Sequence, residues 1–376
     1  MIVPFKIDAP HGGGDTAAMA DTESLTRALT IQAGVCAAMG SAFSGALLER
    51  AAADVTAGGP TRDLFAPWKE ASTRSLIAEA APLRLLGALH DRALSGEDPA
   101  LAGAYPTAER RGDAEAAWAA GIEAMADDPR RFADFMAHEP QTNEVRRSVC
   151  LLGGFLAVAR QTGLPLRSLE IAASAGLNQL WDRYGYRLGE VGAWGEETAT
   201  VAIDTEWRGP PPALDAPVSV IERAACDRKP VDLTDPLARR RLRAFIWADQ
   251  IDRLQRLDAA IEAALAAGVC VEAEDAVSWT KRRARPREGA ATVLFHSVFW
   301  QYMPAPSQTA LTATIEALGA LATAAAPFAW LRMEPPPENL AAMEVRLRLW
   351  PSGEERLLAL VHPHGAWVEW KGDAQG

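Results

Sequence analysis

The chain has 376 residues, with 49 Asp or Glu against 38 Lys or Arg, so its formal net charge at pH 7 is −11. A general nucleic-acid-binding protein carries clustered basic residues, so this balance argues against that class and favours a small-molecule or protein substrate. The length fits two domains, each large enough to bury a core, and the acidic surface suits a monomer or a homodimer.

Three features predict a cytoplasmic protein without a membrane anchor. The four cysteines lie far apart and form no C-x-x-C pair, which is typical of reduced thiols. The first residues lack the basic start and apolar run of a secretory leader. No apolar stretch approaches the length of a membrane span, since even the Ala-rich segment 313–331 contains Glu316.

From about residue 22 to residue 163 the pattern is helical, with apolar residues three and four positions apart. Breaks fall at 57–60, 95–99 and 127–129, where Gly, Asp and Pro end one helix and allow the next to begin. We therefore expect an all-helical N-terminal domain over residues 1–160, built from five to seven helices.

After residue 163, short strand-like segments alternate with helices, which predicts βαβ units and a parallel sheet. The last segments have no helices between them and predict antiparallel strands. We expect a second domain, residues 161–376, with a mostly parallel α/β sheet that finishes in an antiparallel hairpin. The expected strands are 166–172, 218–224, 269–273, 292–298, 328–333, 344–349, 355–362 and 366–370, and the expected helices are 177–184, 235–267 and 308–326. Residues 185–217 are an insertion, either a hairpin over the sheet edge or a flap over a site.

The stretch SLEIAASAGLNQLWDRYG, residues 168–185, has two incompatible interpretations. The small-x-Ser-x-small pattern of AASAG resembles a nucleophile elbow, which would make Ser174 the attacking group of a hydrolase. The same residues fit a strand that ends in an acid, Glu170, followed by a tight loop of small residues, as in nucleoside-cofactor sites. The hydrolase needs an oxyanion hole from an earlier strand loop, and everything before Leu166 has a helical pattern.

A hydrolase also needs an acid and a histidine after the serine, and Asp275 or Glu334 with His362 or His364 has that order. The two histidines alternate on an expected strand without a third ligand nearby, so we expect no metal site. No G-x-G-x-x-G opens a helix, which argues against a nicotinamide or flavin enzyme.

The order of expected elements over about residues 165–370 resembles that of the class I S-adenosylmethionine-dependent methyltransferases, which have a Rossmann-like sheet. Four local blocks also look like a bacterial family of uncharacterised proteins. These blocks are QTNEVRRSVCLLGGFL at 141–156, LEIAASAGLNQLWDRY at 169–184, ACDRKPVDLTDP at 225–236 and VLFHSVFWQYMP at 293–304.

In the methyltransferases the first strand ends in an acid, and a glycine loop follows whose backbone approaches the cofactor. Here Glu170 matches the acid and Gly176 matches the last glycine. Ala172 and Ser174 stand where the family usually has glycine, and their small side chains still permit a close approach. The resemblance implies S-adenosylmethionine as the cofactor, held by these four residues and by Asn178.

Two further acids follow expected strands and complete the implied cofactor site. The resemblance places an acid after the second strand, where a carboxylate accepts hydrogen bonds from both ribose hydroxyls. Asp227 is favoured for this position, and Glu222 is the alternative. Asp275, after the third strand, matches the family position that contacts the adenine amino group.

The block FHSVFWQYMP follows the fourth strand, at the sheet edge where open α/β folds place their chemistry. His296 is a candidate general base, Tyr302 a second catalytic candidate, and Gln301 a substrate-binding candidate. The alternative for His296 is a structural role in an apolar strand. Asn143 and Glu144 either cap the helix that follows them or bind substrate.

These residues together predict an S-adenosylmethionine-dependent methyltransferase with an unknown small-molecule or protein acceptor. Two alternatives remain open at this level. One is a methyltransferase-like binding or interaction module without catalysis, and the other is a hydrolase based on Ser174.

Overall fold

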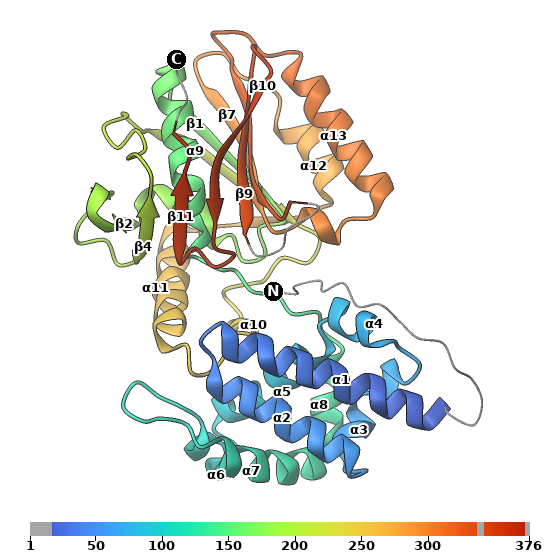
Figure 1. The fold of residues 1–376 in the computed structure, drawn as a ribbon. Helices are drawn as coiled ribbons and strands as arrows, with labels where there is room; N and C mark the ends of the chain where they lie inside the picture. The colour runs from blue at the N-terminus through green and yellow to red at the C-terminus, as the bar shows by residue number, and fades with distance from the viewer. Residues whose placement is uncertain (1–16, 337–341, 373–376) are drawn as a thin grey trace. The chain divides into compact units, whose positions relative to one another are not determined.

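The computed structural model describes residues 17–336 and 342–372 (Figure 1). Residues 1–16, on which the prediction about a leader rests, lie outside the described residues. The chain divides into two compact units, each made of two chain segments. One unit contains the described residues up to Thr142 together with Asp235–Gln255, and the other contains Asn143–Thr234 together with the residues from Arg256 onwards. The expected boundary at residue 160 falls within the second unit.

The first unit is helical, as the sequence predicts, and its three predicted breaks are confirmed. Three of its helices are only four to six residues long, so more helices precede Thr142 than the five to seven expected. The helices are α1 (Ala17–Ala38), α2 (Ala42–Thr56), α3 (Thr61–Leu64), α4 (Thr73–Ala78), α5 (Ala81–Ser95), α6 (Pro99–Ala104), α7 (Ala114–Asp127), α8 (Pro129–Met136), α10 (Pro236–Ala244) and the start of α11 (Ile251–Ala267), with a 3-10 turn, η1, at Ala66–Trp68.

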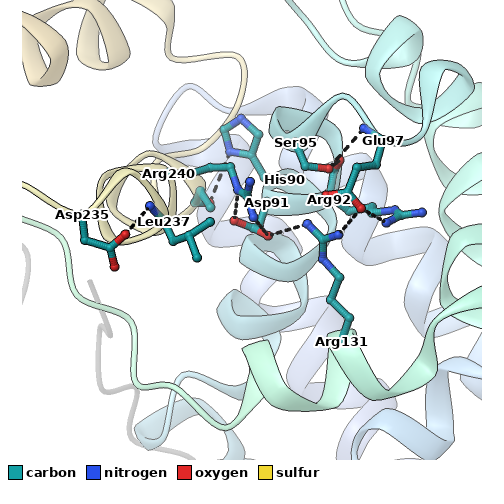
Figure 2. A network of polar contacts seen from close by, with 10 residues as sticks. His90, Asp91, Arg92, Ser95, Glu97, Arg131, Asp235, Leu237 and Arg240 are labelled. Atoms are coloured by element: carbon teal, nitrogen blue, oxygen red, sulfur yellow. Dashed lines mark hydrogen bonds and ion pairs between the residues drawn. The ribbon is translucent and has the colours of Figure 1, made fainter.

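Helix α5 is buried along most of its length and carries a polar network that holds α10 (Figure 2). The carboxylate of Asp91 accepts hydrogen bonds from Arg240 Nε at 2.8 Å and from Arg131 Nη2 at 3.3 Å. His90 Nδ1 lies 3.0 Å from the carbonyl oxygen of Ile246. Burial lowers the pKa of His90 to about 4, so this imidazole is neutral at pH 7.

The second unit is built around an eleven-stranded sheet with the order β3-β2-β4-β11-β10-β9-β8-β7-β1-β5-β6. Pairing is parallel among β6, β5, β1, β7 and β8 and antiparallel from β8 to β11. The mostly parallel sheet with a terminal antiparallel part is therefore confirmed. The strands are β1 (Leu166–Ile171), β2 (Gly185–Leu188), β3 (Ala193–Trp194), β4 (Ala202–Arg208), β5 (Val220–Asp227), β6 (Val271–Ala273), β7 (Ala291–Ser297), β8 (Phe328–Glu334), β9 (Met343–Trp350), β10 (Glu354–Val361) and β11 (Trp367–Trp370).

Helices lie on both faces of this sheet (Figure 1). On one face, α9 (Arg147–Thr162) places Phe155 against Phe295 of β7, with ring centroids 5.1 Å apart. On the other face, α12 (Ala276–Arg283) and α13 (Ala305–Gly319) pack in one apolar core with Leu294 and Trp330. Alternate residues of a strand point to opposite faces, so Phe295 and Leu294 identify the two layers.

The insertion after β1 extends the sheet at its far edge. β2 and β3 form an antiparallel pair, and β4 pairs in parallel with β2 and with β11. A short 3-10 turn, η3 (Gly189–Val191), joins β2 to β3. In the strand order, five strands separate β4 from β1, so these strands extend the sheet on its other side.

Other elements differ from the expected ranges in detail. The helix expected at 177–184 is a 3-10 segment, η2 (Leu177–Arg183), with a kink at Leu180. The helix expected at 235–267 is divided into α10 and α11, and α13 ends at Gly319 rather than at residue 326. No helix within the described ranges is both long and apolar enough to span a membrane.

Candidate functional site

The point where the strand order reverses lies between β1 and β7. Within the parallel part of the sheet, β1 is followed along the chain by β5 and β6 on one side and then by β7 and β8 on the other. In open α/β sheets, ligands bind outside the carboxyl ends of the strands at such a point. The segments that follow β1, β5 and β7 are therefore the place to look for a site.

The segment after β1 is a strained loop. Ala172 and Ser174 have φ values of 55° and 54°, and Gly176 has a φ of 72°. The left-handed region costs a residue with a side chain roughly 1–2 kcal/mol, so Ala and Ser adopt it only where surrounding contacts impose it. The backbone thus has a glycine-like conformation at all three positions, although two of them are not glycine.

Asp227, at the end of β5, is one of the contacts that fix this loop. Its carboxylate accepts hydrogen bonds from Ser174 N and from Lys229 N, each at 2.8 Å. The alternative acid, Glu222, lies five residues earlier on β5 and is ion-paired with Arg167 at 2.9 Å. The structure therefore places Asp227, and not Glu222, at the carboxyl end of the strand.

Glu170 is a buried acid directly below the loop, with 3 % of its surface exposed. Burial is the main cause that raises its pKa to about 8; a hydrogen bond from Gln179 Nε2 at 3.1 Å opposes the rise, and the nearby charge of Asp227 adds to it. Glu170 is consequently neutral at pH 7 in the ligand-free chain.

Buried polar atoms follow Glu170 along the chain, in the loop after β1 and in η2. Within the part of the chain that the structure describes, Ser174 Oγ, Asn178 Oδ1 and Gln179 Oε1 are buried and have no hydrogen-bond partner. Such atoms are rare in folded proteins, because each one costs free energy when it leaves water. Their grouping next to a strained loop marks this position as unusual.

Asn143 and Glu144 join this group from the segment before α9. Asn143 Oδ1 accepts a hydrogen bond from Leu177 N at 2.8 Å, and Asn178 Nδ2 donates to the carbonyl oxygen of Glu144 at 3.4 Å. The Glu144 carboxylate accepts from Arg146 N at 3.1 Å, next to the start of α9. This contact reaches Arg146, the residue before α9, and not an N–H group within the helix, so the expected cap is not seen; both Asn143 and Glu144 border the loop.

The candidate base His296 has both ring nitrogens engaged. Trp330 Nε1 donates to His296 Nε2 at 3.1 Å, so Nδ1 carries the proton, and this nitrogen lies 2.7 Å from Glu334 Oε1. A base needs a free lone pair, and this geometry therefore favours the structural alternative for His296. The histidine also points to the α12 face, whereas Glu170 is in register with Phe295 and points to the α9 face.

The remaining candidates lie at neighbouring strand ends. Asp275 is exposed and caps α12, because its carboxylate accepts from Val277 N and Ser278 N. Gln301 and Tyr302 lie in a 3-10 turn after β7, η4 (Trp300–Tyr302), and Tyr302 is 53 % exposed. The structure brings together Asn143, Glu144, Glu170, Ala172, Ser174, Gly176, Asn178 and Asp227, and it leaves Asp275, His296, Gln301 and Tyr302 outside that group.

The hydrolase interpretation lacks its base in this arrangement. Ser174 Oγ has no partner among the described residues, and Glu334 is bonded to His296. His362 Nδ1 accepts a hydrogen bond from the backbone of His364 at 3.0 Å. The described residues also hold no group of three His, Cys, Asp or Glu side chains arranged as metal ligands.

Residues 26–370 match a family model described as "Uncharacterized protein conserved in bacteria (DUF2332)". The chain belongs to this family. The matched region contains all four blocks that resembled a bacterial family, and three of them converge on the loop after β1. No curated protein and no solved structure matches the chain.

Reasoning from the sequence of this DUF2332 member missed Gln179 altogether and named Glu334 only as an alternative acid of a hydrolase. Gln179 contacts Glu170, and Glu334 contacts both His296 and the backbone of the turn after β7. Glu334 is the last residue of β8 and Glu170 is the second-last residue of β1. An acid at the end of a strand was the sequence pattern that could have indicated Glu334. Nothing in the local sequence of Gln179 indicates its partner.

Proposed function

We propose that the chain is an S-adenosylmethionine-dependent methyltransferase that acts on a small-molecule or protein acceptor. The observation that carries this proposal is the loop after β1, where glycine-like φ values at Ala172, Ser174 and Gly176 follow the buried acid Glu170. This loop lies at the point where the strand order reverses, and an acid of the neighbouring strand holds it.

The strand order supports a Rossmann-like sheet of the methyltransferase type. The order β6-β5-β1-β7-β8 has the 3-2-1-4-5 pattern of doubly wound nucleotide-binding sheets. Two features depart from that pattern. β1 is followed by the 3-10 segment η2 in place of an α-helix, and the connection to β5 runs through the strands at the far sheet edge.

The residues present fit an adenosyl ligand. The loop keeps the backbone conformation of a glycine loop, and its side chains at Ala172 and Ser174 are small. At Gly176 an added Cβ would lie 2.8 Å from Val271 Cγ2, so this position has no room for a side chain. Glu170 and the buried oxygens of Ser174 and Asn178 offer acceptors to the polar, donor-rich part of the ligand.

When bound, S-adenosylmethionine supplies an activated methyl group to a nucleophilic atom of the acceptor. The chain's own residues act by positioning and by excluding water, because an in-line transfer depends mainly on alignment. Asp227 fixes the loop, Asp275 is the candidate contact for adenine, and Glu170 orients the ligand from below. His296 positions other residues in this scheme and takes no proton.

A titration with S-adenosylmethionine and S-adenosylhomocysteine tests the proposal by thermal shift and by calorimetry. A ligand at about 100 times its dissociation constant adds about 2.7 kcal/mol of stability, so a specific site gives a saturable shift. Glu170→Gln should weaken binding at least about tenfold, since Glu170 can release its proton when the cationic ligand binds and then accept a charged hydrogen bond, whereas Gln cannot. Glu222→Gln is the matched control on the neighbouring strand and should leave binding unchanged.

Asp275→Asn separates the capping role of Asp275 from a contact with adenine, because Asn is as good an N-cap as Asp. Weaker binding with an unchanged melting temperature supports the adenine contact. Absence of any shift at millimolar ligand would remove the methyltransferase proposal and favour an interaction module. Loss of an esterase activity in Ser174→Ala, in a chain that binds no adenosyl ligand, would favour the hydrolase.

A further inference from the structure

Aromatic rings gather at the carboxyl ends of β7 and β8, on the α12 face of the sheet. The Trp300 ring is stacked on His296, with centroids 5.7 Å apart and an interplanar angle of 17°. Trp330 lies 5.6 Å from Trp300, and Phe299 lies edge-on to His296 at 5.6 Å. His296 and Trp330 are buried, whereas Phe299 and Trp300 are only partly buried and form the outer side of the cluster.

The backbone that carries the outer rings is held rigidly. Glu334 accepts hydrogen bonds from Phe299 N at 3.0 Å and from Trp300 N at 3.2 Å, in addition to its contact with His296. Val298, just before them, has a φ of 53°, which is a rare conformation for a β-branched residue. Strain of this kind persists only where the surroundings impose it, and such positions are frequent at binding sites.

Gln301 follows Trp300 in the turn η4 and supplies a polar group. One end of its amide, assigned as Nε2, is buried and has no hydrogen-bond partner among the residues that the structure describes. An amide presents one donor edge and one acceptor edge, so it pairs with a ligand that offers either. Aromatic faces with an adjoining amide are suited to a flat ring whose edge carries polar atoms.

We propose that Phe299, Trp300 and Gln301 bind the methyl acceptor, and that this acceptor carries a planar conjugated ring with a hydrogen-bonding edge. The identification of this ligand as the methyl acceptor rests on the proposed function, but the binding surface itself does not depend on an adenosyl ligand. Trp330, His296 and Glu334 are positioning residues, because they fix the backbone of the outer rings without reaching the ligand.

Binding of small probes to the full chain tests the inference, by calorimetry and by saturation-transfer NMR, with and without S-adenosylhomocysteine. One arm uses aromatic acids such as 4-hydroxybenzoate, a second uses nitrogen heterocycles such as adenine, and the matched control is trans-4-hydroxycyclohexanecarboxylate. A planar probe should bind at least about tenfold more tightly than the saturated acid, because the saturated ring cannot stack on the aromatic side chains. The arm that binds more tightly identifies the ring chemistry.

Variants locate the surface. Trp300→Ala should lower the affinity for the planar probe about tenfold, and Trp300→Phe should restore most of it, since a flat face remains. Trp367→Ala is the control, because Trp367 on β11 is also partly buried but stacks with Arg208 of β4. Glu334→Gln should weaken the planar probe and leave adenosyl binding unchanged, a separation that a general loss of folding does not produce.

Equal affinity for planar and saturated probes would overturn the inference, as would binding that Trp300→Ala leaves intact or no binding of any probe at millimolar concentration. Because these measurements do not require an adenosyl ligand, their failure is distinguishable from failure of the proposed function.

Discussion

Glu170→Gln should stabilise the ligand-free protein at neutral pH, and more so as the pH rises. Burial raises the pKa of Glu170 to about 8 in the folded chain, against 4.5 for the exposed side chain. Between these values the folded chain holds a proton that the unfolded chain releases. The free energy of unfolding of the wild type therefore falls as the pH rises above 4.5. The loss, relative to the value at low pH, is about 3 kcal/mol at pH 7 and about 5 kcal/mol once the pH is well above 8.

Gln has the shape of the neutral acid but does not ionise, so the variant escapes this loss. We expect equal stabilities at pH 4.5, an advantage for Glu170→Gln of about 3 kcal/mol at pH 7, and a larger one at pH 8. The assay is urea unfolding at each pH, followed by tryptophan fluorescence, because most of the tryptophans lie in the second unit.

Glu222→Gln is a control with the opposite sign. The hydrogen bond from Arg167 lowers the pKa of Glu222, so its carboxylate stabilises the fold above the unfolded pKa and loses that effect as the pH falls. This variant should be less stable than the wild type at pH 7. If Glu170→Gln and the wild type kept a constant difference across the whole pH range, the argument from burial would be refuted.

Three further predictions concern the loop and the helical unit. Asp227→Ala removes the acceptor of two backbone hydrogen bonds and should lower the free energy of unfolding by about 2 kcal/mol in urea titrations, and an unchanged value would contradict the contacts described. Ser174→Gly relieves a left-handed residue and should raise the free energy of unfolding by up to about 1 kcal/mol in urea titrations, whereas a less stable variant would speak against the strained backbone. Burial lowers the pKa of His90 to about 4, so the free energy of unfolding of the wild type should fall by up to about 3 kcal/mol as the pH falls from 6.5 to 4. The free energy of unfolding of His90→Gln should fall less over the same range. Parallel pH profiles of the two proteins in urea unfolding would refute this.

The sequence predicts those features that depend on local chemistry. The breaks at 57–60, 95–99 and 127–129 follow from Gly, Asp and Pro, which act on the backbone wherever they stand. Strand alternation likewise indicates the mostly parallel sheet and its antiparallel end. The acid and the small-residue loop after β1 could also be recognised, because one short segment contains both.

Features that depend on partners far away in the chain could not be predicted. Residues 235–267 have one continuous helical pattern, and only contacts such as that of His90 with Ile246 show that the first part belongs to the helical unit. The role of His296 is decided by Trp330 and Glu334 on the next strand, more than 30 residues later. A pattern within one segment carries no information about such pairings, since register and side-chain partners are tertiary properties.

The position of β11 has a consequence for the order in which the protein is synthesised. Residues 367–370 form the strand that joins β4 to β10, so the sheet exists as two separate pieces until these residues have been made. Until then both β4 and β10 present open edges with unpaired backbone groups, and such edges are templates for aggregation. A ribosome that stops before Trp367 would release a chain that contains all the other strands and an unfinished sheet.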